Sequence, residues 1–173
     1  MKVFGLAGWS GSGKTTLLKQ LIPTLVDRGL KVSTLKHAHH KFDVDKPGKD
    51  SYEHREAGAS EVMIASGNRW ALMHELRDEK EPSLQELIPR MTPVDLLLIE
   101  GFKRENHQKL EVYRPSLGKR MLHKDDPNII AVATDEDFEN TKLPIIDLND
   151  IESIADFICK VCDLNDRTRK AAD

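Results

Sequence analysis

The residues from 8 to 16 read Gly8-Trp9-Ser10-Gly11-Ser12-Gly13-Lys14-Thr15-Thr16 and match the pattern G-x-x-x-x-G-K-[ST] at every fixed position. Glycines let the backbone curl, so that successive N–H groups point into one concavity in which an anion can sit. The start of a following helix adds unpaired N–H groups and the positive end of its dipole. The motif therefore predicts a phosphate-binding loop, with the contacts made by Gly8, Ser10, Gly11, Ser12, Gly13, Lys14, Thr15 and Thr16.

Three side chains are expected to act on a bound nucleoside triphosphate. Lys14 would reach the β- and γ-phosphates, and the Thr15 hydroxyl would be a ligand of Mg²⁺. The segment Val94-Asp95-Leu96-Leu97-Leu98-Ile99-Glu100-Gly101 has the apolar-then-acidic pattern of a Walker B strand. Glu100, at the carboxyl end of that strand, would orient a water or help to hold the magnesium, whereas Asp95 lies at the wrong end and is expected to be structural. We therefore assign Lys14 and Glu100 to catalysis and Thr15 and Glu100 to the metal.

The segments around the loop predict alternating strands and helices. Residues 3–7 and 31–35 are expected to be strands on either side of a helix that stops at Gly29, and such a unit implies parallel pairing. Ser66-Gly67-Asn68 joins the two strands of an expected hairpin. The remaining expected elements are a short helix opened by a Ser83–Glu86 capping box, strands at 110–113, 128–133 and 143–146, and a last helix capped by Asn149.

This order of elements predicts a P-loop NTPase-like, three-layer α/β fold. The sheet is expected to be mostly parallel but mixed, with an inserted β-hairpin. Residues 1–164 would form one nucleotide-binding domain, and the polar residues 165–173 would form a disordered tail. Cys159 and Cys162 lie on the last predicted helix, where a core position is expected rather than a disulfide or a metal site.

The composition excludes several classes of protein. The chain has 173 residues, with 26 Lys and Arg against 29 Asp and Glu, and the formal net charge of −3 argues against a general nucleic-acid binder. Its longest apolar run falls far short of the roughly 18 residues that a membrane span needs, and its first residues do not resemble a signal peptide. We expect a soluble, cytoplasmic protein with neither nucleic acid nor membrane as a partner.

A polar, histidine-rich segment follows the second predicted strand. It contains His37, His39 and His40, with Lys49 and Asp50 further on, and is expected at the same sheet edge as the phosphates. One acid of the segment, Asp45, would complete the magnesium shell, because Thr15 alone supplies too few oxygen ligands. The histidines could instead bind a transition metal, but without cysteines this signal is weak and an anion-binding loop is the commoner outcome.

Four blocks of this sequence together resemble the molybdopterin-guanine dinucleotide biosynthesis protein B (MobB) family. They are the P-loop, the run from Lys36-His37-Ala38-His39-His40 to Gly48-Lys49-Asp50-Ser51, Ala57-Gly58-Ala59, and Glu100-Gly101-Phe102-Lys103. The second block is much more specific than the P-loop, and the resemblance spans roughly residues 1–160.

The resemblance implies a GTP-binding accessory protein with weak intrinsic hydrolysis. With Mg²⁺ as the accompanying ion, it would assist a partner that attaches GMP to molybdopterin. The implied partners are the molybdopterin guanylyltransferase and a molybdenum-insertion enzyme, and the implied assembly is a homodimer whose sheets extend across the interface. The segment with His37, His39, His40, Lys49 and Asp50 would then meet pterin, phosphate or a partner.

Two other functions remain open from the sequence. In a small-molecule kinase, Arg114, Lys119 and Arg120 would close over the transferred phosphoryl group, although no acceptor-binding motif is present. In a metal-insertion chaperone GTPase, the histidines would hold nickel or zinc. The preference for GTP over ATP does not follow from motifs, because the guanine-reading pattern Asn/Thr-Lys-x-Asp is absent and Thr134-Asp135 only occupies a suitable place for a base-contacting loop.

Overall fold

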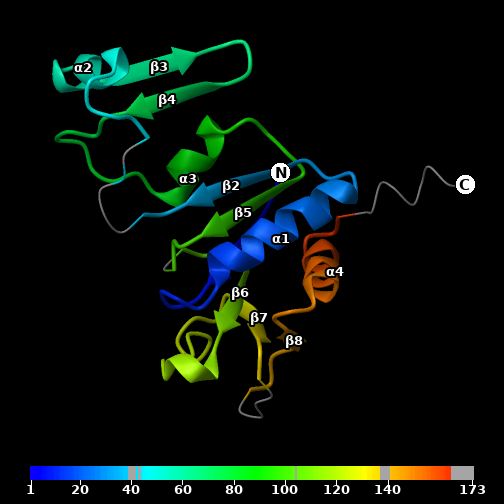
Figure 1. Ribbon diagram of the computed structural model, residues 1–173. Helices are drawn as coiled ribbons and strands as arrows, with labels where there is room; N and C mark the ends of the chain where they lie inside the picture. The colour runs from blue at the N-terminus through cyan, green and yellow to red at the C-terminus, as the bar shows by residue number, and fades with distance from the viewer. Residues whose placement is uncertain (39–41, 43, 104, 137–140, 165–173) are drawn as a thin grey trace, which may run out of the picture. The chain divides into compact units, whose positions relative to one another are not determined.

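The structure is a computed structural model and describes residues 1–38, 42, 44–103, 105–136 and 141–164. The chain forms two compact units, of which the first is made of Met1–His37 with Thr92–Asp173 and the second of Ala38–Met91 (Figure 1). The tail expected over residues 165–173 lies outside the described residues, and one domain over residues 1–164 stays a prediction.

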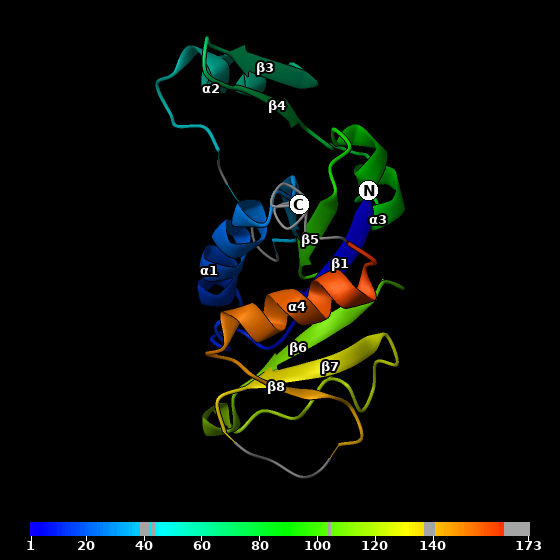
Figure 2. The same cartoon turned by 90° about the vertical axis from the view of Figure 1, so that its right-hand side faces the viewer.

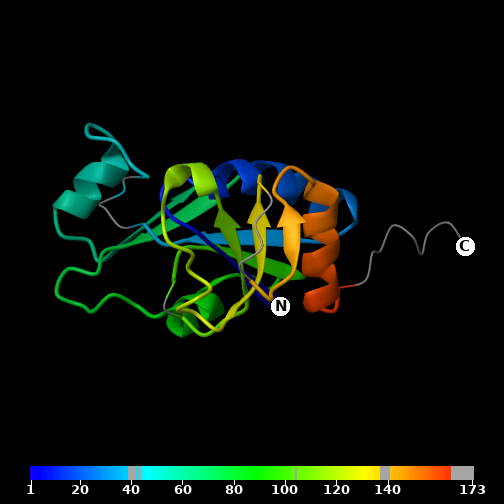
Figure 3. The same cartoon turned by 90° about the horizontal axis from the view of Figure 1, so that it is seen from below.

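The first unit is built on a six-stranded sheet with the strand order β2-β5-β1-β6-β7-β8. All of its recorded strand pairings are parallel, and the arrows of β6, β7 and β8 point the same way in Figure 3. The carboxyl ends of the strands therefore meet at one edge, where ligands bind in such sheets. The strands are β1 (Lys2–Ala7), β2 (Val32–Lys36), β5 (Leu96–Glu100), β6 (Lys109–Tyr113), β7 (Ile129–Thr134) and β8 (Ile145–Asp147).

Two helices, α1 (Lys14–Asp27) and α4 (Ile151–Val161), cover one face of this sheet. Figure 2 shows α4 running across the strands with α1 beside it. Both helices turn an apolar stripe inward because their apolar residues recur at helical spacing. Together with alternate strand residues they form the core, whose fully buried members include Phe4, Leu6, Leu21, Leu25, Leu96, Leu98, Leu110, Ile154 and Ile158.

Connecting segments cover parts of the opposite face of the sheet. The buried carboxylate of Glu111 accepts hydrogen bonds from the backbone N–H of Leu122 (2.6 Å) and of His123 (3.0 Å), and contacts the Nδ1 of His123 (2.7 Å). The fully buried Lys109 donates from Nζ to Glu105 O (2.6 Å) and to Asp126 Oδ2 (3.0 Å). These bonds satisfy two charged side chains that would otherwise be costly to bury, and they fix the connection between β6 and β7.

The second unit consists of a hairpin and short helices. Strands β3 (Glu61–Ala65) and β4 (Trp70–His74) pair antiparallel and form a two-stranded sheet of their own. Helix α2 (Asp50–Glu56) lies against β3. Helix α3 (Leu84–Leu87), which is followed by a 3₁₀ turn at Ile88–Arg90, begins at the predicted capping box.

The predicted fold class is confirmed, and the differences concern details. The hairpin forms a separate sheet, so it leaves the six-stranded sheet parallel rather than mixed. Asp95 is structural as expected, since its Oδ2 accepts a hydrogen bond from Lys31 N at 2.8 Å. The cap expected at Asn149 is wrong by one residue: Asp150 accepts from Ser153 N (3.0 Å), while the Asn149 amide donates to Asp147 Oδ1.

No helix among the described residues has the length and apolar character needed to cross a bilayer.

Candidate functional site

The loop between β1 and α1 has the backbone that its glycines predict. Gly8, Gly11 and Gly13 have φ angles of 152°, 83° and 98°, values that side-chain-bearing residues rarely adopt. The loop also lies close to the neighbouring strand, because a Cβ on Gly8 would be only 2.6 Å from the backbone oxygen of Val112. The turn therefore requires glycine for its backbone angles, and at Gly8 also because of the proximity of β6.

Lys14 folds back over this loop. Its Nζ donates hydrogen bonds to the backbone oxygens of Gly8 (3.0 Å) and Trp9 (2.9 Å). Burial lowers the pKa of Lys14; Glu100 acts in the opposite direction, and Lys103 and Lys36 lower it further. The ammonium group is thus bonded to the backbone of the loop, and Lys36 and Lys103 are near enough to act on its charge. A bound polyphosphate would neutralise these basic side chains.

The end of β5 meets the start of α1 through two predicted site residues. Thr15 Oγ1 donates to Glu100 Oε1 at 3.4 Å, and Lys36 Nζ lies 3.6 Å from the same oxygen. The Glu100 side chain is only 13% exposed. A hydroxyl and a carboxylate are the hard oxygen donors that Mg²⁺ prefers, so Thr15 and Glu100 fit a magnesium ion by their chemistry.

The residues directly after Glu100 connect β2 with the phosphate loop. Gly101 has a φ of 95°, and a Cβ there would lie 2.9 Å from the Cβ of His37. The His37 ring in turn lies 4.7 Å from the Phe102 ring, centroid to centroid. The next residue, Lys103, places its Nζ 4.8 Å from the centre of the Trp9 ring. His37 therefore belongs to the carboxyl edge of the first unit, as expected.

Arg114, which follows β6, borders the other side of the loop. Its Nε donates to Ser12 O at 3.1 Å, and its NH1 forms an ion pair with Asp135, which follows β7. The guanidinium group lies against Gly13, where its Nε and NH2 would be 3.5 Å from an added Cβ. The kinase hypothesis expected Arg114 to close over a phosphoryl group, whereas these bonds hold it beside the backbone of the loop.

The connection from β6 to β7 touches the phosphate loop at two further places. The indole N–H of Trp9 donates to Arg120 O at 2.7 Å, and a Cβ on Gly11 would lie 3.9 Å from Leu117. Glu111 anchors the far end of the same connection. The loop conformation therefore depends on contacts from the β6–β7 connection as well as on its own glycines.

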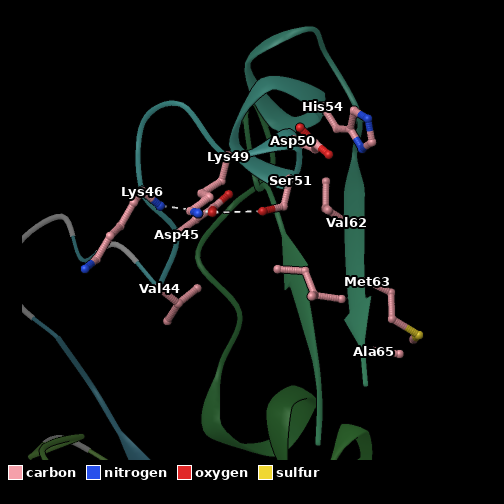
Figure 4. A pocket seen from close by; sticks show the side chains of 11 residues that line it. Val44, Asp45, Lys46, Lys49, Asp50, Ser51, His54, Val62, Met63 and Ala65 are labelled. Carbon is pink, nitrogen blue, oxygen red and sulfur yellow. Dashed lines mark hydrogen bonds between the residues drawn. The ribbon is translucent and has the colours of Figure 1, made fainter. Parts of the chain in front are cut away.

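A separate pocket lies within the second unit, between residues 44–54 and strand β3 (Figure 4). Its volume is about 610 Å³. Asp45, which is 9% exposed, accepts hydrogen bonds from Lys46 N and Ser51 Oγ, both at 2.9 Å, and so fixes the chain before α2. The lining residues are Val44, Asp45, Lys46, Lys49, Asp50, Ser51, His54, Val62, Met63, Ile64 and Ala65.

The structure thus distributes the predicted site residues over two units. Lys14, Thr15 and Glu100 come together at the carboxyl edge of the first unit, with Ser10 exposed in the loop and Thr16 on the first turn of α1.

Asp45, Lys49 and Asp50 line the pocket of the second unit, so Asp45 as a magnesium ligand stays a prediction. His39 and His40 lie outside the described residues. In the part of the chain that is described, no three potential metal ligands form a cluster.

Sequence reasoning missed several contacts of the site. The positions of Lys36 and Lys103 beside the loop follow from strand order, which no motif states. The ion pair between Arg114 and Asp135 could not be predicted from the sequence either. The two residues are 21 positions apart in the chain, and only the parallel pairing of β6 with β7 brings them together. An arginine and an acid, each directly after a predicted strand, are the one signal that would have suggested it.

Comparison with known proteins identifies the family of this chain. Residues 3–135 match the family model described as molybdopterin guanine dinucleotide synthesis protein B. The molybdopterin-guanine dinucleotide biosynthesis adapter protein of Escherichia coli (strain K12) is 49% identical over 159 residues, which are 90% of each chain. The protein of the same name from Haemophilus influenzae is 45% identical, over 90% of this chain and 86% of that one. A crystal structure of molybdopterin-guanine biosynthesis protein B superimposes with a TM-score of 0.73 at 27% identity, covering 93% of this chain and 99% of that one.

Proposed function

Since this chain belongs to the molybdopterin guanine dinucleotide synthesis protein B family, we propose that it is a GTP-binding accessory protein in molybdenum cofactor biosynthesis. The names of its relatives in Escherichia coli and Haemophilus influenzae, which are adapter proteins of molybdopterin-guanine dinucleotide biosynthesis, support this role. The observation that carries the nucleotide site is the meeting of Lys14, Thr15 and Glu100 at one edge of the sheet.

In this proposal Lys14 acts on the phosphates, whereas Thr15 and Glu100 act together on the metal. The loop N–H groups and Lys14 bind the β- and γ-phosphates, and Thr15 with Glu100 holds Mg²⁺. Hydrolysis by the protein alone is expected to be slow, because Arg114 is engaged by Ser12 and Asp135. An arginine that a partner supplies adds roughly 10³–10⁵ to the rate of such reactions, so a partner that completes the site fits an accessory role.

The proposed partner is the molybdopterin guanylyltransferase, with a molybdenum-insertion enzyme as a second one. The direct test measures the rate of GMP attachment to molybdopterin by the purified transferase, with and without this protein. We expect the protein to raise that rate, Lys14→Ala to abolish the gain, and Lys19→Ala, which removes an exposed lysine of α1, to retain it. A gain that is equal for all three proteins would contradict a nucleotide-dependent role.

A homodimer is also proposed, and the hairpin of the second unit supports it. Met63 and Trp70 are 62% and 64% exposed, and Leu72 is 46% exposed. A hairpin with exposed apolar side chains offers unpaired edges and apolar area to a second copy. Sedimentation of Trp70→Lys should show a shift toward monomer, whereas Asn68→Lys in the turn of the same hairpin should not. Unchanged mass for Trp70→Lys would remove this support.

We also propose that the pocket of the second unit binds a phosphorylated pterin. The β3 wall supplies apolar surface for a flat ring, and Lys49 and His54 supply groups that attract a phosphate. Pterin fluorescence would report binding directly. We expect Lys49→Ala to weaken it and Lys80→Ala, at an exposed position of the same unit, to leave it unchanged. Equal affinity for both variants would contradict a phosphate contact at Lys49.

A further inference from the structure

A small cavity adjoins the phosphate loop, lined by the start of α1, by Arg114 after β6 and by the connection from β8 to α4. Its volume is about 90 Å³, and Gly13 and Thr16 of the loop form part of its wall. The rest of the lining combines apolar side chains with two amides and one guanidinium group. These residues are Leu17, Gln20, Arg114, Leu148, Asn149 and Ile151.

The places of this cavity and of the proposed metal ligands in the sheet indicate in which direction a bound nucleotide would extend. In the sheet, β5 and β6 lie on opposite sides of β1. Thr15 and Glu100 would hold the metal, and with it the β- and γ-phosphates, toward β5. A triphosphate is a linear chain, so its α-phosphate and nucleoside would extend from the loop toward β6. This step rests on the proposed nucleotide-binding function.

The arginine in this cavity is held in a fixed position. Asp135 engages NH1, and the bond from Nε to Ser12 O ties the same side chain to the loop. The guanidinium group also lies beside Gly13, where an added Cβ would be 3.5 Å from its Nε and NH2. A guanidinium group is planar and weakly hydrated, and such groups stack on aromatic rings without having to be ordered first.

We propose that Arg114 contacts the nucleoside half of the bound nucleotide, with its guanidinium plane against the base. The lining suits this ligand, because a base has apolar faces and a polar edge, and the cavity offers leucines and an isoleucine beside the amides of Gln20 and Asn149. Asp135 is a positioning residue that acts through Arg114. Arg114 and Asp135 together determine the affinity for the nucleoside, whereas Lys14 binds the phosphates.

Two ligands separate these roles in one experiment. Mg²⁺ with GTP carries phosphates and nucleoside, whereas Mg²⁺ with inorganic tripolyphosphate carries phosphates alone. Arg114→Ala and Arg114→Lys should each bind GTP about tenfold more weakly. Their affinity for tripolyphosphate should fall clearly less, by the part that comes from losing the Nε bond to Ser12 O. Asp135→Asn should show a smaller loss, for GTP only. Lys119→Ala, which removes an exposed basic side chain of the same connection, is the control and should change neither affinity.

The results distinguish a failure of this inference from a failure of the proposed function. Equal losses for GTP and tripolyphosphate in Arg114→Lys would make Arg114 a phosphate contact or a structural residue and overturn the inference. Unchanged GTP affinity in both Arg114 variants would overturn it as well. If Lys14→Ala left both ligands bound as before, the nucleotide site itself would fail. Unfolding midpoints measured for every variant identify any loss that comes from misfolding, and Arg114→Lys, which retains the charge, then decides the result.

Discussion

The hydroxyl of Thr15 donates a hydrogen bond to Oε1 of Glu100 across 3.4 Å, although 85 residues separate the two in the chain. Thr15 lies in the first turn of α1, and Glu100 is the last residue of β5, the neighbour of β1. Parallel pairing of those strands, with Leu6 opposite Glu100, brings both oxygens to the same edge. The contact therefore joins the phosphate loop to the end of β5, the two parts of the proposed nucleotide and magnesium site.

Replacing Glu100 by Gln tests the metal half of that site. The change keeps the shape of the side chain but removes the negative charge, so the gain in GTP affinity that Mg²⁺ brings should become clearly smaller. Titration with GTP in excess Mg²⁺ and in excess chelator measures the difference. Glu56→Gln, an exposed acid of the second unit, should retain the full effect of Mg²⁺. A normal Mg²⁺ effect in Glu100→Gln would exclude Glu100 from metal binding.

Gly8→Ala tests the shape of the loop. A methyl group at residue 8 would lie 2.6 Å from both Ser12 Oγ and the backbone oxygen of Val112, and the latter belongs to a core strand that cannot easily move. The φ of 152° adds strain. We expect GTP binding to be lost and the free energy of unfolding to fall by about 1–3 kcal/mol. Gly67→Ala, where nothing lies within 4 Å, is the control; equal behaviour of both variants would contradict the account.

His107 predicts how stability depends on pH. Burial, with help from Lys109, lowers the pKa of His107 to about 4, and both ring nitrogens are buried without a hydrogen-bond partner. The unfolded chain takes up a proton near pH 6.5, whereas the folded protein resists it until about pH 4. The contribution to stability is therefore complete above pH 6.5 and is lost as the pH falls from there toward 4, with a slope of up to about 1.4 kcal/mol per pH unit.

Urea unfolding at pH 7.5 and pH 5 measures this effect. The drop in unfolding free energy between the two values should be smaller in His107→Gln than in the unchanged protein. His54→Gln, which removes an exposed histidine, should leave the drop as it is. The same pH dependence in all three proteins would show that His107 is not the group responsible.

The sequence predicted most of the first unit because its signals are local. An apolar run before Gly8, a helical period after Lys14 and an acid at residue 100 each depend on a few neighbouring residues, and together they imply a parallel sheet with a phosphate loop. The Ser83–Glu86 capping box was predictable for the same reason.

Contacts that depend on strand order were beyond the sequence. Nothing near Arg114 indicates that its partners are Ser12 and Asp135, because both contacts arise from the order β1-β6-β7. The N-cap of α4 could not be decided from the sequence, because Asn149 and Asp150 are both good capping residues. In the turn after β8 the Asn149 side chain bonds Asp147, and Asp150 becomes the cap.

Calorimetric titration of the full chain with GTP and with ATP, both in the presence of Mg²⁺, tests the central claim most directly. The account predicts saturable binding of GTP by the unchanged protein, weaker binding of ATP, and a loss of at least about tenfold in GTP affinity for Lys14→Ala, because the phosphate-facing ammonium group is removed. Lys19→Ala should bind as the unchanged protein does. Undetectable GTP binding, or equal affinities for the unchanged protein and Lys14→Ala, would contradict it.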